Sequence, residues 1–201
     1  MKPIIGIIAR PYYSEENNMM FGAYKDIINS VFCSGGIPIC ISPTEKYLFE
    51  TISLCDGLIF QGGDNFMEYE KLSLNYAYKN DIPILGICLG MQLMGVMFDA
   101  EEYDVFNHKD KNKLHKVIID KNSKLYSILK KEEVLVNSRH KSAIKNLKLS
   151  VVGVSQDGVI EAIEDKNKKF FIGVQWHPEN MVVYDITSQK LFKSFINICK
   201  I

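Results

Sequence analysis

Residues 82–98, IPILGICLGMQLMGVMF, decide the fold of this chain. The run Ile82–Gly86 is short, apolar and rich in isoleucine, which is typical of a strand buried in a parallel sheet. Leu89–Phe98 then follows a helical pattern, so Cys88 falls between the strand and the helix. The stretch is shorter than the ~20 apolar residues that usually span a bilayer, and we therefore reject a transmembrane segment.

The residues before this unit repeat the same alternation. Short β-rich runs at Ile4–Ala9, Ile37–Ile41 and Leu58–Phe60 are separated by helical patterns at Ala23–Cys33 and Glu45–Leu54. This order predicts an α/β fold with a doubly wound, mostly parallel sheet that helices cover on both faces.

The second half of the chain has a different pattern. Its shorter β-like runs are Lys116–Ile119, Val134–Asn137, Ser150–Val154, Val159–Ile163 and Phe170–Gln175. They predict a mixed or antiparallel extension of the same sheet. A closing helix is expected to pack on the sheet through one apolar stripe. That stripe contains Leu191, Phe192, Phe195, Ile196 and Cys199. We expect a single domain over 1–201, because 201 residues with 47% hydrophobic content can bury a full core.

Composition excludes several classes of partner and location. Lysine plus arginine and aspartate plus glutamate both number 24, so no excess charge points to nucleic acid or to an anionic membrane. The five cysteines are an odd number without a CxxC pair, which argues against a disulfide framework or a structural zinc site. A reducing, cytoplasmic location fits this usage. Ile4–Ala9 is too short for a secretory signal.

Cys88 is the candidate nucleophile. In Gly86-Ile87-Cys88-Leu89-Gly90 the glycines permit a cramped turn from strand to helix, which lifts a side chain clear of the backbone. The positive end of the helix dipole favours a thiolate there. The alternative is a small buried cysteine in a well-packed turn.

A base and an orienting carboxylate stand near the end of another strand. In Gln175-Trp176-His177-Pro178-Glu179, His177 would transfer the proton and Glu179 would hold the imidazole. Gln61-Gly62-Gly63-Asp64 ends a third strand, where the backbone N–H of Gly63 would join that of Leu89 as an oxyanion donor. A plain tight turn is the alternative for the glycine pair.

Other polar residues give weaker signals. Gln92 lies in an otherwise apolar helix and would satisfy a buried backbone group or contact substrate. The cluster Asn137-Ser138-Arg139-His140 ends a strand at the same sheet edge and is expected to line the pocket. His108 and His115 flank a charged loop, and we predict no metal site there because no carboxylate or cysteine stands at ligand spacing.

Five motifs together resemble the class I glutamine amidotransferase-like family. They are Gln61–Asp64, Gly86–Gln92, Val136–His140, Asp157–Ala162 and Gly173–Glu179. The third and fourth look most like the γ-glutamyl–γ-aminobutyrate hydrolase branch. The resemblance implies a flavodoxin-like fold, a Cys88–His177–Glu179 triad and a γ-glutamyl thioester, without metal or organic cofactor. It assigns the oxyanion hole to the backbone of Gly63 and Leu89, and glutamyl recognition to Gln92 and the Ser138–His140 backbone region. Gly62 is a further candidate for substrate binding.

Several departures from that branch concern the mouth of the site. Leu89 stands where the hydrolase branch usually has arginine, and Lys141-Ser142 stands where it has histidine-glutamine. The glycine pair that the branch has beyond the elbow helix is absent from Phe98–Glu102. The stretch Asp64–Asn80 is short and lacks the acidic and arginine residues of the branch. The leaving amine therefore stays open.

Three functions remain in competition. The first is a hydrolase that acts alone on small γ-glutamyl amines. The second is a glutaminase subunit that releases ammonia from glutamine for a separate synthetase partner. The third is a binding module without catalysis on the same fold.

Overall fold

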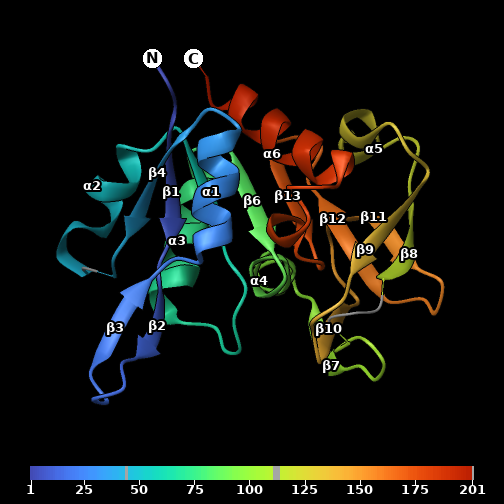
Figure 1. The fold of residues 1–201 in the computed structure, drawn as a ribbon, viewed down its shortest axis with the longest axis horizontal. Helices are drawn as coiled ribbons and strands as arrows, with labels where there is room; N and C mark the ends of the chain where they lie inside the picture. The colour runs from blue at the N-terminus through green and yellow to red at the C-terminus, as the bar shows by residue number, and fades with distance from the viewer. Residues whose placement is uncertain (44, 111–113, 201) are drawn as a thin grey trace.

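The structure is a computed structural model that describes residues 1–43, 45–110 and 114–200. Within these ranges, nine strands form one sheet (Figure 1). In sheet order they are β4 (Ile37–Ile41), β1 (Ile4–Ile8), β5 (Gly57–Phe60), β6 (Ile84–Ile87), β13 (Phe171–Val174), β12 (Ile160–Glu164), β11 (Ser150–Ser155), β8 (Leu114–Ile119) and β9 (Glu133–Asn137).

The sheet has a parallel part and an antiparallel part. From β4 to β13 each strand pairs in parallel with its neighbour, and from β13 to β9 every pairing is antiparallel. The α/β fold with a mostly parallel first half and an antiparallel extension is thereby confirmed. Because the carboxyl ends of the parallel strands share one edge, the residues that follow β5, β6 and β13 meet there.

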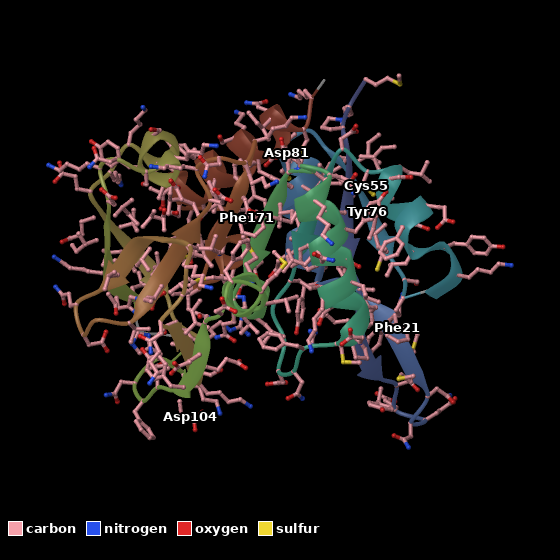
Figure 2. All side chains as sticks on the ribbon, turned by 180° about the vertical axis from the view of Figure 1, so that it is seen from behind. Phe21, Cys55, Tyr76, Asp81, Asp104 and Phe171 are labelled. Carbon is pink, nitrogen blue, oxygen red and sulfur yellow. The ribbon has the colours of Figure 1, made fainter. Side chains whose placement is uncertain are left out.

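Helices cover both faces of the sheet. They are α1 (Lys25–Cys33), α2 (Leu48–Ser53), α3 (Glu68–Lys79), α4 (Leu89–Val96), α5 (Lys124–Leu129) and α6 (Ile186–Ile198). Side chains alternate along a strand, so Ile7 of β1 packs in one core with Phe192 and Phe195 of α6, while Ile8 packs in the other with Leu74 of α3. Figure 2 shows α3 in front of the sheet on this second face, together with Phe171 of β13. The predicted closing helix is confirmed.

Some elements were not predicted from the sequence. A hairpin of β2 (Arg10–Tyr13) and β3 (Met19–Gly22) follows β1, and β7 (Glu101–Asp104) pairs with β10 (Ser142–Lys145). Both lie apart from the main sheet (Figure 1), so their residues lack the long apolar runs that mark its central strands. The helix expected over Glu45–Leu54 is a 3₁₀ turn, η1 (Glu45–Tyr47), followed by α2.

None of the helices in the described residues combines the length and the apolar character that a bilayer crossing requires. All five cysteines are free thiols.

Candidate active site

Cys88 occupies a strained turn between β6 and α4. Its φ of +53° and ψ of −106° lie in a region that non-glycine residues rarely adopt. The turn is held at both sides, since the Cys88 N–H donates to the Val174 carbonyl at 2.8 Å and its carbonyl accepts from the Gln92 N–H at 3.1 Å. A Cβ at Gly90 would overlap the Phe60 carbonyl, so glycine is needed for α4 to pack against β5. Strain of this kind is typical of functional sites.

His177 and Glu179 form a close pair just past β13. Nδ1 of His177 lies 2.7 Å from Oε1 of Glu179, and the two side chains are only 13% and 4% exposed. Asn137 at the end of β9 holds the His177 backbone, because its amide group accepts from the His177 N–H at 2.8 Å and donates to the His177 carbonyl at 2.9 Å. The imidazole is therefore fixed through both its backbone and its ring.

The surroundings favour the charged form of His177. Burial by itself would lower the pKa of His177, but the hydrogen bonds with Cys88 and Glu179 outweigh it and raise this pKa to about 10. The populated form near neutral pH is therefore the imidazolium. A positive charge next to a cysteine sulfur favours the thiolate, which is the nucleophilic form.

Gln92 and Gln175 form a buried chain behind the sulfur. The Gln175 side-chain amide donates to Sγ of Cys88 at 3.6 Å, and its carbonyl oxygen accepts from Nε2 of Gln92 at 3.0 Å. Nε2 of Gln92 also donates to the Ser142 carbonyl at 2.8 Å. Of the two roles expected for Gln92, the structure shows the first, a hydrogen bond to a backbone carbonyl, and adds a bond that orients Gln175.

A cavity of about 480 Å³ opens at Cys88. The residues that line it are Tyr24, Lys25, Asp26, Gly62, Gly63, Asp64, Cys88, Arg139, His177, Glu179 and Asn180. The fold thus brings Cys88, His177, Glu179 and the glycine pair together from separate strand ends. The described residues that line this cavity do not include Gln92, Ser138 or His140.

The loop after β5 is fixed from two sides. Gln61 donates to the carbonyls of Ile8 and Gly22 at 2.7 and 3.0 Å, which ties the loop to β1 and β3. Arg10 lies so close to Gly63 that a Cβ there would overlap the guanidinium. The same guanidinium is bound to Glu70 of α3. Sequence reasoning missed Arg10 and Glu70, since neither stands in a motif.

Charges of both signs surround the mouth of this cavity. Nη1 of Arg139 donates to Oδ1 of Asn180 at 2.5 Å, and the Asn180 amide donates to Asp26 at 2.9 Å. Lys25 and Asp64 also line the cavity, and Nζ of Lys141 lies 3.4 Å from Asp64. Such a mouth can bind a zwitterionic group.

Ser138 and His140 face a different polar cluster. Ser138 donates to the His108 carbonyl at 2.7 Å, and Nε2 of His140 lies 3.1 Å from Nδ1 of His108. Neighbouring side chains of an extended segment point in opposite directions, which explains why Arg139 alone of these three lines the cavity. Glu161 lies at the centre of the cluster. Burial would raise the pKa of Glu161, but the imidazoles of His108, His115 and His140 hold it well below its usual range.

Comparisons with known proteins agree with this geometry. Residues 67–179 match the model of the family described as peptidase C26. A Rickettsia prowazekii protein, provisionally named glutamine amidotransferase-like, is 28% identical over 99% of this chain and 98% of its own length. A Schizosaccharomyces pombe protein provisionally named a glutamine amidotransferase is 37% identical over 86% of this chain and 81% of its own. The solved glutaminase domain of Trypanosoma brucei CTPS, with bound acivicin, superposes on this chain with a TM-score of 0.73 at 18% identity. The match covers 98% of this chain and 93% of that domain, so the two share a fold.

Proposed function

The chain belongs to the peptidase C26 family, and on that premise we propose that it is a cysteine hydrolase that cleaves the γ-glutamyl amide bond of a small γ-glutamyl amine. One observation carries the proposal: Cys88, held at a positive φ, shares a cavity with a histidine that is 2.7 Å from a buried carboxylate. This arrangement meets the requirements of an activated nucleophile, a proton carrier and an orienting group.

In the first half-reaction the Cys88 thiolate attacks the γ-carbonyl carbon of the substrate. A carbon–sulfur bond forms, and the carbonyl electron pair moves onto the oxygen. The imidazolium of His177 then gives its proton to the leaving nitrogen as the carbon–nitrogen bond breaks. The products are a free amine and a γ-glutamyl thioester on Cys88.

In the second half-reaction neutral His177 takes a proton from water. The resulting hydroxide oxygen attacks the thioester carbon, the carbon–sulfur bond breaks, and glutamate leaves. The thiolate and the imidazolium are restored together. Glu179 stabilises the imidazolium each time it forms, because its carboxylate stays at hydrogen-bond distance from Nδ1.

Two backbone N–H groups are assigned to the developing oxyanion. The N–H of Leu89 is in the first turn of α4, where helix N–H groups lack partners within the helix. The N–H of Gly63 lies in the loop that Arg10 supports. Donors placed in advance at such a site typically contribute about 2.7–4 kcal/mol to transition-state stability.

The charges at the cavity mouth support a γ-glutamyl substrate. The glutamyl head carries one α-carboxylate and one α-ammonium group, and the mouth offers Arg139 and Lys25 for the first and Asp26 and Asp64 for the second. We assign Arg139 to the α-carboxylate, since a guanidinium binds carboxylates through a planar pair of donors.

A glutaminase that releases ammonia from glutamine is the second candidate. It uses the same chemistry with ammonia as the leaving group. The solved glutaminase domain of CTPS shares the fold of this chain at 18% identity. Under this reading a separate synthetase would receive the ammonia.

The test is release of glutamate and amine by the purified chain alone. γ-Glutamyl amines of increasing amine size are compared with glutamine, and Cys88→Ala serves as the control. Cleavage of the amines by the wild type and not by the variant supports the hydrolase. Turnover of glutamine alone, or only after a partner is added, supports the glutaminase. If neither substrate class is cleaved, the catalytic proposal is wrong.

A further inference from the structure

A second polar cluster lies away from Cys88 and takes no part in the proposed reaction. It joins His108, which follows β7, to His115 of β8 and Glu161 of β12. His108 is 3% exposed and Glu161 is fully buried. One donor atom from each of the three residues lies within 4.8 Å of the other two.

The two histidines converge on one carboxylate oxygen. Oε1 of Glu161 lies 3.2 Å from Nε2 of His115 and 3.4 Å from Nδ1 of His108. Hydrogen bonds between nitrogen and oxygen usually measure about 2.7–3.2 Å. Donor atoms that share a tetrahedral zinc ion at about 2.0–2.2 Å are separated by about 3.3–3.6 Å, which follows from the tetrahedral angle. The 3.4 Å separation from His108 fits the second geometry, and the 3.2 Å separation from His115 lies at the upper end of the first.

The cluster also leaves buried polar atoms unsatisfied. Among the described residues, both oxygens of Glu161 and Nε2 of His115 are buried without a hydrogen-bond partner. An ionised carboxylate without partners is strongly destabilising in a protein interior unless a cation compensates it. Oε1 of Glu161 faces the imidazoles of His115, His108 and His140 at 3.2, 3.4 and 3.5 Å, whereas Oε2 has no hydrogen-bond partner among the described residues and is left for a positive ion.

A partner outside the cluster orients the His108 ring. Nε2 of His108 lies 3.0 Å from Oδ2 of Asp157, a distance that places an N–H at this nitrogen. A neutral His108 then has its lone pair on Nδ1, which lies 3.4 Å from Oε1 of Glu161 and 3.1 Å from Nε2 of His140. Metal-binding histidines usually donate their other N–H to a carboxylate or a backbone carbonyl in this way.

The cluster is open to solvent on one side. A cavity of about 480 Å³ is lined by His108, His115 and Asp157, among others. An ion can enter through it, and a water molecule can complete the coordination.

We propose that His108, His115 and Glu161 form a binding site for one divalent transition-metal ion, with Zn²⁺ as the best fit to a set of two imidazoles and one carboxylate. The sequence predicted no metal here because no carboxylate stands near the two histidines along the chain. The fold supplies it from β12. A bound ion would link the segment after β7 and strand β8 to the central part of the sheet.

The test measures metal binding directly, in the Cys88→Ser chain so that the reactive thiol cannot be a ligand. The chain is stripped with a chelator and titrated with Co²⁺, and Zn²⁺ is then added in competition. We expect one equivalent of Co²⁺ with the visible absorption of a four-coordinate site, no near-ultraviolet band from thiolate ligation, and displacement by one equivalent of Zn²⁺. Zn²⁺ should also raise the Tm, because it binds only the folded chain.

Two further variants locate the ion. His115→Gln should abolish the Co²⁺ absorption, because it removes a ligand. Asp157→Asn should weaken Zn²⁺ binding about 10–100-fold, as expected for a group that orients a ligand. Asp99→Asn is the matched control, since Asp99 is similarly exposed but is paired with Lys148. It should leave the affinity unchanged.

The proposal is overturned if the Cys88→Ser chain binds no Co²⁺ or Zn²⁺ at micromolar concentration. It is also overturned if His115→Gln binds as tightly as its parent. Should His115→Gln fail to fold, Asp157→Asn decides, because its exposed side chain can be replaced without disturbing the core: unchanged affinity then contradicts the site.

Discussion

Nη1 of Arg10 donates to both carboxylate oxygens of Glu70, at 2.7 and 2.8 Å. The two side chains are only 12% and 4% exposed, so this is a largely buried ion pair between the first residue of β2 and the first turn of α3. Arg10 also donates to the Asn65 carbonyl at 2.6 Å and lies against Gly63. The pair therefore holds the loop that carries one of the two assigned oxyanion donors.

Glu70→Gln should lower the free energy of unfolding by about 3–5 kcal/mol, because it leaves the Arg10 charge buried without its counter-ion. Urea denaturation measures this change. The double variant Arg10→Met/Glu70→Leu should recover most of the stability, since apolar side chains of similar volume replace the pair. The hydrolase activity of this double variant should remain below that of the wild type, because the loop that contains Gly63 loses the contact with Arg10. A Glu70→Gln chain as stable as the wild type would contradict this account.

Gly63→Ala should lower kcat about 10²–10³-fold while KM changes little, as when one oxyanion donor is lost. The reason is steric, since the new methyl group would overlap the Arg10 guanidinium and displace the backbone. Steady-state kinetics on a γ-glutamyl amine give both constants. Alkylation of Cys88 by iodoacetamide is the control and should proceed at the wild-type rate, because the thiolate and His177 are untouched. A slower alkylation would mean that the substitution disturbs Cys88 itself.

The pH dependence of activity should follow His177. Its pKa is raised to about 10, partly by Glu179, so the imidazolium is present below that pH and is lost as the pH rises through it. An ordinary histidine would lose its proton near a pKa of about 6.5. The alkaline limb of kcat/KM should therefore lie near pH 10 for the wild type.

Removing the Glu179 charge should move that limb to lower pH. In Glu179→Gln the pKa of His177 falls, and kcat should fall about 10²–10⁴-fold because proton transfer loses its orienting group. A pH profile of kcat/KM for both chains is the measurement. An alkaline limb at the same pH in the two chains would exclude Glu179 as a cause of the raised pKa.

Gln175→Met should slow the alkylation of Cys88 by about 10–100-fold. The substitution removes the N–H donor that lies 3.6 Å from the sulfur, and hydrogen bonds to charged groups contribute about 1.5–3 kcal/mol. Gln92→Met should have a smaller effect, because it leaves that donor in place and only removes the group that orients it. Equal rates in the wild type and both variants would show that the buried glutamine chain does not act on the thiolate.

The main sheet and its edge were predictable because their signals are local. Ile82–Gly86 followed by the helical pattern from Leu89 is enough to place Cys88 at a strand-to-helix turn, and the alternation of runs before it predicts the parallel half. The β2–β3 hairpin and the β7–β10 pair were missed because they are short and partly exposed, and such strands lack the hydrophobic periodicity on which the prediction depends.

The sequence by itself determined the alternation of strands and helices in the first half of the chain, and it predicted Cys88, His177 and Glu179 as the candidate triad at the carboxyl edge of the sheet. Only the tertiary structure decided which other polar side chains join them. Two roles were open for Gln92, and the structure shows that it bonds the Ser142 carbonyl and orients Gln175. Ser138 and His140 face a separate cluster with Glu161. The ion pair between Arg10 and Glu70 was not predicted, because neither residue belongs to a sequence motif. The physical reason is that the pattern of apolar residues along a short segment sets where a strand ends. Contacts between side chains far apart in the chain depend instead on how the twist and register of the sheet bring those strand ends together.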